Sequence, residues 1–163
     1  MASSARTLWA ATVARLGLAA IWAWAGVAKA ADPNGAVLSV RAYRLLPEAL
    51  VRPVAWGLPF LELALAALLL AGVANRAAAV TSAGLLALFM AGIAAAWARG
   101  LRIDCGCFSA GGPDASAGAA QYLGELLRDT GLLLASAFLA WRPQTRLAVA
   151  HTGEGHPDLE QEH

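Results

Sequence analysis

The sequence predicts an all-α integral membrane protein built as a four-helix bundle, and three observations lead to this prediction. First, 59% of the 163 residues are hydrophobic and 14% are charged, with a mean hydropathy of +0.57, whereas soluble domains average about 25% charged residues. Second, the apolar residues fall in four blocks, at residues 8–28, 54–74, 77–98 and 121–141. Third, each block has the length of about 20 residues that a helix needs to cross a bilayer.

The first block contains one charge, Arg15. Its start resembles a secretory signal, because Arg6 precedes an apolar core. The core is followed at residues 28–30 by Ala-Lys-Ala, which has small residues at the first and third positions, as a cleavage site does. A cleaved signal would leave three spans. We interpret the block as a span, since its apolar residues extend back beyond Arg15 and reach spanning length. Residues 1–142 then form one membrane domain of a multi-pass protein of the cell membrane.

A long connection, residues 29–53, follows the first block. A turn signal at residues 32–35 precedes apolar and basic residues that are spaced like a short interfacial helix over residues 37–45. Pro47 is expected to end this helix, because proline lacks the backbone N–H that a helix interior needs.

The second block has Glu62 as its one charge, and the third block has none. Asn75 and Arg76 make so short a turn between them that the two helices are expected to be antiparallel neighbours. Aromatic residues, among them Trp22 and Tyr122, lie within about two turns of the expected helix ends, as aromatic rings at a membrane interface do.

The first half of the fourth block carries a polar stripe. The stripe consists of residues that recur at helical intervals, namely Gln121, Glu125, Arg128 and Asp129. Ionisable residues within spans usually face the bundle interior. The stripe begins on the side of the membrane where the two cysteines lie. Glu62 is expected about 12 Å below that surface, since a helix rises about 1.5 Å per residue, and an ion pair between Glu62 and Arg15 is geometrically possible. The ionisable residues within the spans either hold the four helices in register, or handle protons or bind a cofactor that accepts electrons.

The sharpest chemical feature is the segment Asp-Cys-Gly-Cys-Phe at residues 104–108, between the third and fourth blocks. Two thiols one residue apart close only a small, strained disulfide ring, and strain makes a disulfide a better oxidant. Neighbouring Arg102 favours a thiolate, whereas Asp104 opposes it. The pattern predicts a redox pair at Cys105 and Cys107, with inert free thiols as the simpler alternative.

Metal and nucleic acid are disfavoured as ligands. Zinc takes four ligands in structural sites, and beyond the two cysteines they would have to come from histidines in the tail, which is expected on the opposite side of the membrane. Twelve basic against eleven acidic residues leave no electrostatic footprint for nucleic acid. The tail itself, residues 143–163, is polar and acidic and is expected to be disordered.

The orientation in the membrane is left open by two opposing indications. Six lysines and arginines outside the spans fall on the cysteine side and four on the other, which favours a cytoplasmic cysteine side by the positive-inside rule. A disulfide-forming pair, in contrast, needs the oxidising exterior.

Several of these motifs, in this order and spacing, resemble the MauE family of membrane proteins, which are relatives of DoxX. The resemblance runs from about Arg15 to Trp141. It is carried by the following residues and runs: Arg15-Leu16-Gly17, Ala25-Gly26-Val27-Ala28-Lys29, Arg41, Tyr43, Leu46-Pro47, Leu58-Pro59, Leu61-Glu62, Asp104-Cys105-Gly106-Cys107-Phe108 and Arg128-Asp129.

The resemblance implies a membrane protein linked to disulfide formation and to the maturation of proteins outside the cytoplasm. In methylamine users the implied client is the small (β) subunit of methylamine dehydrogenase, with a thioredoxin-like partner. Carried over by position, Cys105 and Cys107 are the redox pair, and Lys29, Arg41, Glu62, Arg128 and Asp129 match polar positions of the family.

Whether the protein is an enzyme stays open at this point. A membrane thiol-disulfide oxidoreductase would pass electrons to an acceptor in the bilayer, for which a membrane quinone is the candidate. A non-enzymatic scaffold for the thioredoxin-like partner is the chief alternative, and a small transporter that uses the buried charges is another. All three place the protein in contact with lipid.

Overall fold

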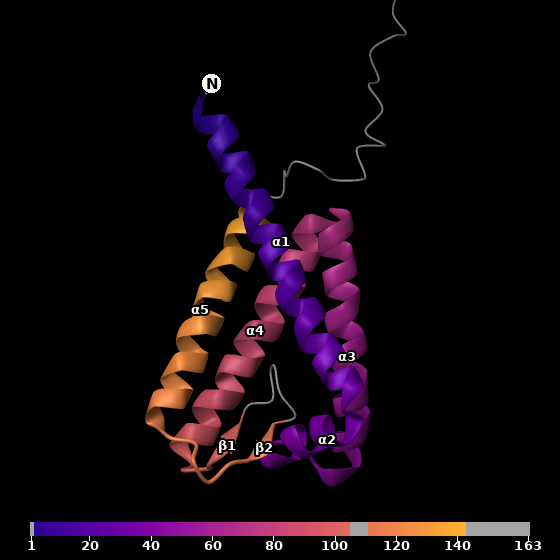
Figure 1. Cartoon of the computed structure of the whole chain (residues 1–163), viewed down its shortest axis with the longest axis vertical. Coiled ribbons are helices and arrows are strands. Elements are labelled where there is room, and N and C mark those ends of the chain that lie inside the picture. The colour runs from indigo at the N-terminus through magenta and orange to yellow at the C-terminus, as the bar shows by residue number, and fades with distance from the viewer. Residues whose placement is uncertain (1, 105–110, 143–163) are drawn as a thin grey trace, which may run out of the picture.

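Helices make up most of the protein in a computed structural model that describes residues 2–104 and 111–142 (Figure 1). The cysteines, at positions 105 and 107, and the tail expected to be disordered lie outside the described residues. The elements are α1 (Ala2–Ala31), α2 (Pro33–Ala42), α3 (Glu48–Ala71), α4 (Asn75–Ala98), β1 (Ile103–Asp104), β2 (Gly112–Pro113) and α5 (Ala119–Trp141).

The predicted all-α membrane protein is confirmed, although the count of four spans is not exact. The four apolar blocks correspond to α1, α3, α4 and α5, and α2 is a fifth, shorter helix. Within the described residues, α1, α3 and α4 are long and apolar enough to cross a membrane. The helix α5 has 23 residues but is not among them, because its first half carries the polar stripe.

Helix boundaries differ from the apolar blocks where local geometry decides them. The helix α3 begins at Glu48, six residues before the apolar block at residue 54, with Pro47 as its N-cap. It ends at Ala71 because Gly72 has a φ of 71°, a left-handed conformation that glycine adopts at no steric cost. The amide of Val73 then bonds to Leu68 O at 3.2 Å, which closes the helix end.

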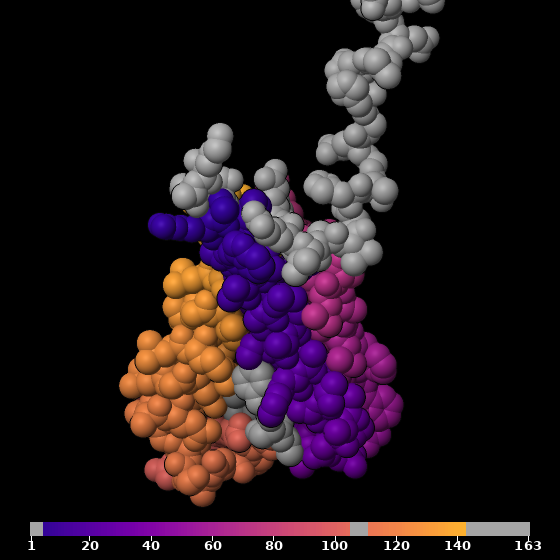
Figure 2. Space-filling model, turned by 45° about the horizontal axis from the view of Figure 1, so that its top comes forward, coloured from indigo at the N-terminus to yellow at the C-terminus, as the bar shows by residue number. Residues whose placement is uncertain are grey.

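The long helices pack as two pairs, α1 along α3 and α4 along α5. The helices α3 and α4 are antiparallel, as predicted, but they contact each other far less than the partners within each pair do. Figure 2 shows α1 running over the face of the molecule, with α5 on one side of it and α3 on the other. One core of buried side chains, including Leu18, Leu69, Leu86 and Leu139, joins all four helices.

Both α2 and the sheet lie at one end of the bundle, where α1 and α4 end and where α3 and α5 begin (Figure 1). We call this end the cap. The helix α2 starts at Pro33, with the Asp32 carboxylate accepting a hydrogen bond from the Gly35 amide at 2.9 Å. It ends at Ala42, earlier than the expected end near Pro47, because the chain turns at Arg44, which has a φ of 50°.

The strands β1 and β2 form a short antiparallel sheet, with Ile103 opposite Pro113 and Asp104 opposite Gly112. Both strands contact α2. Sequence patterning does not predict this sheet, because two-residue strands are too short to show the alternation that marks a strand.

Candidate functional site

A buried ion pair links α1 to α3. The Lys29 ammonium donates to both carboxylate oxygens of Glu62, at 2.9 and 3.2 Å. The side chains are 8% and 0% exposed, respectively. The pair forms because the two helices approach closely at Gly26, where an added Cβ would come within 2.8 Å of Leu63 Cγ and 3.1 Å of Pro59 O. A side chain at position 26 would push the helices apart.

This pairing corrects one expectation. Glu62 meets Lys29 and not Arg15, which the sequence left open as its partner. Lys29 and Arg15 are fourteen residues apart on α1, which is about 21 Å at 1.5 Å per residue. Arg15 itself is buried and lies near the middle of α1.

A second ion pair lies on α5, within the polar stripe. Arg128 Nε and Nη2 each lie 2.9 Å from Asp129 Oδ1. The carboxylate of Asp129 is buried, whereas the Arg128 side chain is one-third exposed. The buried end of the stripe therefore faces the bundle interior, as predicted for ionisable residues within a span.

The two ion pairs line one small cavity among α1, α3, α4 and α5. Its volume is about 20 Å³, which is room for a single water molecule, since a polar cavity of roughly 10–15 Å³ can hold one. Lys29, Glu62, Arg128 and Asp129 all line it, together with apolar side chains. Two cations and two anions meet there, so that the charges balance. Such a centre can hold a proton or bridge it through a water molecule.

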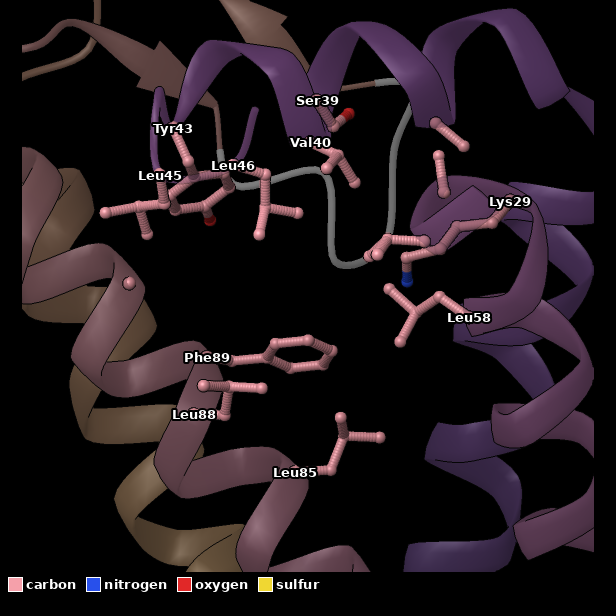
Figure 3. A pocket seen from close by; sticks show the side chains of 14 residues that line it. Lys29, Ser39, Val40, Tyr43, Leu45, Leu46, Leu58, Leu85, Leu88 and Phe89 are labelled. Atoms are coloured by element: carbon pink, nitrogen blue, oxygen red, sulfur yellow. The ribbon is translucent and has the colours of Figure 1, made fainter. Parts of the chain in front are cut away.

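A larger cavity lies beside this charge centre. It has a volume of about 250 Å³, and Figure 3 shows it between the side chains of α4, including Leu85, Leu88 and Phe89, and those of α2 and the end of α1. The described residues that line it are mostly apolar, and Lys29 is the one charged residue among them. Lys29 and Phe89 line both cavities, so the large cavity adjoins the charge centre.

Two of the predicted site residues, Arg41 and Arg102, lie on the cap and line neither cavity. Arg41 forms a surface ion pair with Glu48, and the hydrogen bond from its guanidinium to that carboxylate raises the pKa of Arg41. Arg102 Nη1 donates to Ala115 O at 3.0 Å and so ties β1 to the chain that follows β2. The redox pair predicted at Cys105 and Cys107 lies outside the described residues.

The described residues on either side of the cysteine segment are firmly held. Asp104 and Gly112 are paired across the sheet, so that the described residues before and after the segment lie side by side. The Tyr122 hydroxyl, on the first turn of α5, donates to Leu101 O at 2.5 Å and accepts from the Ile103 amide at 3.1 Å. Tyr122 thereby fastens the start of β1 to α5.

This role of Tyr122 was not predicted, because an aromatic residue near a helix end is typical of the membrane interface. The tyrosine is buried, and its ring stacks on Trp97 of α4 at a centroid distance of 6.0 Å. Trp22 is a second correction: it is buried in the core, and its Nε1 donates to Ser82 Oγ of α4 at 3.0 Å. No sequence signal separates such buried aromatic residues from interfacial ones.

Comparison with known proteins places the chain in a family. The family model described as methylamine utilisation protein MauE matches residues 7–142. The chain belongs to the MauE family. A relative named methylamine utilization protein MauE, from Methylorubrum extorquens, is 43% identical over 105 residues, which are 63% of this chain. The chain spans about half the length of that curated relative, of which the match covers 53%. No solved structure matches the chain.

The matched region of this MauE-family protein contains both ion pairs, both cavities and the cysteine segment. The family and the three long apolar helices together identify a multi-pass membrane protein.

Proposed function

We propose that this MauE-family protein supports disulfide formation in proteins that mature outside the cytoplasm. The family description and the Methylorubrum relative are both named for methylamine utilisation. The client we propose is therefore the small (β) subunit of methylamine dehydrogenase, and the partner that carries the oxidising equivalents to it is a thioredoxin-like protein. In this proposal Cys105 and Cys107 form the working disulfide.

The observation that supports this proposal best is the attachment of the cysteine segment to the cap. The segment follows directly on a paired strand residue, Asp104, and leads back to its partner, Gly112. Tyr122 and Arg102 secure the described residues beside the segment through hydrogen bonds to backbone atoms. Such an attachment at one end of the bundle suits a disulfide that a water-soluble partner must reach.

The proposed reaction is a thiol-disulfide exchange. A thiolate of the partner attacks one sulfur of the Cys105–Cys107 disulfide, which breaks that bond and forms a mixed disulfide. The partner's second thiol then attacks the mixed disulfide, so that the partner leaves oxidised and both cysteines are thiols. Two electrons and two protons have moved from the partner to this pair. A two-electron acceptor in the membrane, for which we propose a quinone, takes them up and restores the disulfide.

The charge centre has a role in this scheme because reoxidation of the two thiols requires two protons to move from the thiols to the reduced acceptor. Glu62 and Asp129 are the carboxylates in the bundle interior that line the small cavity, and Lys29 and Arg128 hold them in place. We assign to this centre the transfer of protons between the cap and the acceptor. Arg41 lies apart from the cavity and serves the surface of the cap.

The experiment that tests the proposal replaces both cysteines by serine and measures disulfide content in the client. The chain has two cysteines in all, so the double variant removes every thiol and leaves the other residues in place. We expect the client to accumulate with reduced cysteines, seen by mass after thiol alkylation. Unchanged client oxidation at normal protein level would overturn the thiol mechanism and favour the scaffold.

Single variants sharpen this test. With one cysteine left, this chain holds no disulfide, but its remaining thiolate can attack the disulfide of the oxidised partner, which forms a mixed disulfide and releases one partner thiolate. This chain then has no second thiol to resolve the mixed disulfide, so a conjugate should be detected in the Cys105→Ser or the Cys107→Ser variant. The conjugate would appear as a band that a reducing agent removes. Its absence from both variants, in cells that hold the partner, would contradict the proposed exchange.

A further inference from the structure

The large apolar cavity has no assigned occupant, and its position restricts what can enter it. It lies between the α1–α3 pair and α4, beneath α2 (Figure 3). Several of its lining residues are also exposed, among them Val54 on α3, Leu88 on α4 and Leu46 between α2 and α3. Exposed apolar side chains on membrane-spanning helices face lipid. The cavity therefore opens to the bilayer, and its occupant must dissolve in lipid.

The volume and lining of the cavity define the chemistry of that occupant. At about 250 Å³ it is larger than the roughly 150 Å³ cavity that holds benzene and smaller than most sites for drug-sized ligands, which start near 300 Å³. It fits one substituted ring. Among the described residues of the lining, the Lys29 ammonium is the one charged group. A ring with a carbonyl oxygen at that end can accept a hydrogen bond from the ammonium, whereas a hydrocarbon chain cannot.

We propose that this cavity binds the ring of a membrane quinone, with one carbonyl oxygen toward Lys29 and the hydrocarbon tail leaving between α3 and α4. The choice of a quinone rests on the proposed function, which needs a lipid-soluble acceptor of two electrons. Reduction of a quinone to a quinol takes up two electrons and two protons, which matches what oxidation of two thiols to a disulfide releases. Lys29 also lines the small cavity, so the charge centre adjoins the oxygen that is protonated.

A photolabelling experiment tests the cavity directly. The full chain is placed in lipid nanodiscs, labelled with an azidoquinone that carries a decyl tail, digested and examined by mass spectrometry. We expect saturable labelling in residues 43–46 and 85–92, which contribute to the lining. Excess decylubiquinone should remove the label, and the same concentration of decanol should not. Label spread over lipid-facing residues of all helices, or equal competition by decanol, would overturn the proposal.

Two variants fill the cavity or its mouth. Ala55 is buried in the lining, and Ala55→Phe should weaken labelling at least about tenfold, equivalent to about 1.4 kcal/mol of binding. Leu88→Trp narrows the mouth from an exposed position and decides the matter if Ala55→Phe does not fold. Leu134→Trp is the matched control, because Leu134 is 65% exposed, Leu88 is 66% exposed, and Leu134 lies on α5 away from the cavity. Unchanged labelling in both cavity variants would contradict the site.

The cysteine-free variant separates this inference from the proposed function. Ring binding needs no thiol, so this variant should label as the wild type does. If the cysteines prove inert while competed labelling persists, the quinone site stands and the thiol chemistry fails. If client oxidation depends on the cysteines but no competed labelling occurs, the site fails and the thiol chemistry stands.

Discussion

The Lys29–Glu62 pair offers the sharpest prediction about what holds the bundle together. We would replace each member by methionine, singly and together, and measure the free energy of unfolding. Glu62 is fully buried and Lys29 is 8% exposed, so each single replacement leaves one charge uncompensated inside the bundle. Such a loss costs about 3–5 kcal/mol. At 1.4 kcal/mol per factor of ten, even the lower value lowers the folding equilibrium by about a hundredfold.

The double variant Lys29→Met with Glu62→Met should recover most of this loss. Both charges are then absent, and apolar replacement of a complete buried pair is often neutral or stabilising. The coupling energy of the cycle should therefore be several kcal/mol. An SDS titration in mixed micelles, followed by helical circular dichroism, gives the free energy of unfolding of all four proteins.

The surface pair Arg41–Glu48 is the control. Both side chains are largely exposed, and water screens such pairs, so Arg41→Met and Glu48→Met should leave the unfolding free energy without a resolvable change. The reasoning is refuted if the single variants at Lys29 and Glu62 behave like these controls, or if the double variant is no more stable than either single one.

Three further predictions concern the parts that position the site. Tyr122→Phe removes the hydroxyl that holds Leu101 O and the Ile103 amide. At about 1 kcal/mol per lost hydrogen bond, exchange of the Ile103 amide with deuterium should accelerate several-fold. An unchanged exchange rate would contradict the role of Tyr122 in holding β1. Gly72→Ala forces a Cβ into a left-handed position, with a φ of 71°, and should lower stability in the SDS titration by about 1 kcal/mol, whereas Gly84→Ala, in a helical position with open space around it, should not. Ser82→Ala leaves the Trp22 N–H without its 3.0 Å acceptor and should cost about 1 kcal/mol by the same assay; a stability equal to that of wild type would show that the bond contributes nothing.

The fold could be predicted from the sequence wherever hydrophobicity and length decide it. The four apolar blocks became the four long helices, and α3 and α4 are antiparallel as predicted, although the connection between them is residues 72–74 and not the predicted turn at Asn75 and Arg76, which begin α4. The polarity of the stripe on α5 also predicted that it faces the bundle interior, and the burial of Asp129 confirms this. These features follow from the cost of placing polar groups in lipid, which depends on residue type alone.

What the sequence could not give is set by distances between helices. Glu62 pairs with Lys29 because Gly26 allows α1 and α3 to approach each other, and a single sequence does not reveal which glycine marks such an approach. Trp22 was expected at the membrane interface, yet α1 continues nine residues beyond it to Ala31 and Trp22 lies in the core. The sheet beside the cysteine segment is held by hydrogen bonds from Tyr122 and Arg102 as well as by its strand pairing, and its two-residue strands leave no periodic pattern.

The central claim, a redox-active disulfide at Cys105 and Cys107 on the outer side of the membrane, is tested most directly by labelling with a bulky maleimide that does not cross membranes. Intact cells and inverted vesicles are labelled before and after reduction. The account predicts labelling after reduction only, and from the outside only. Labelling without reduction, or from the cytoplasmic side alone, would contradict it and leave a scaffold for a thioredoxin-like partner as the better explanation.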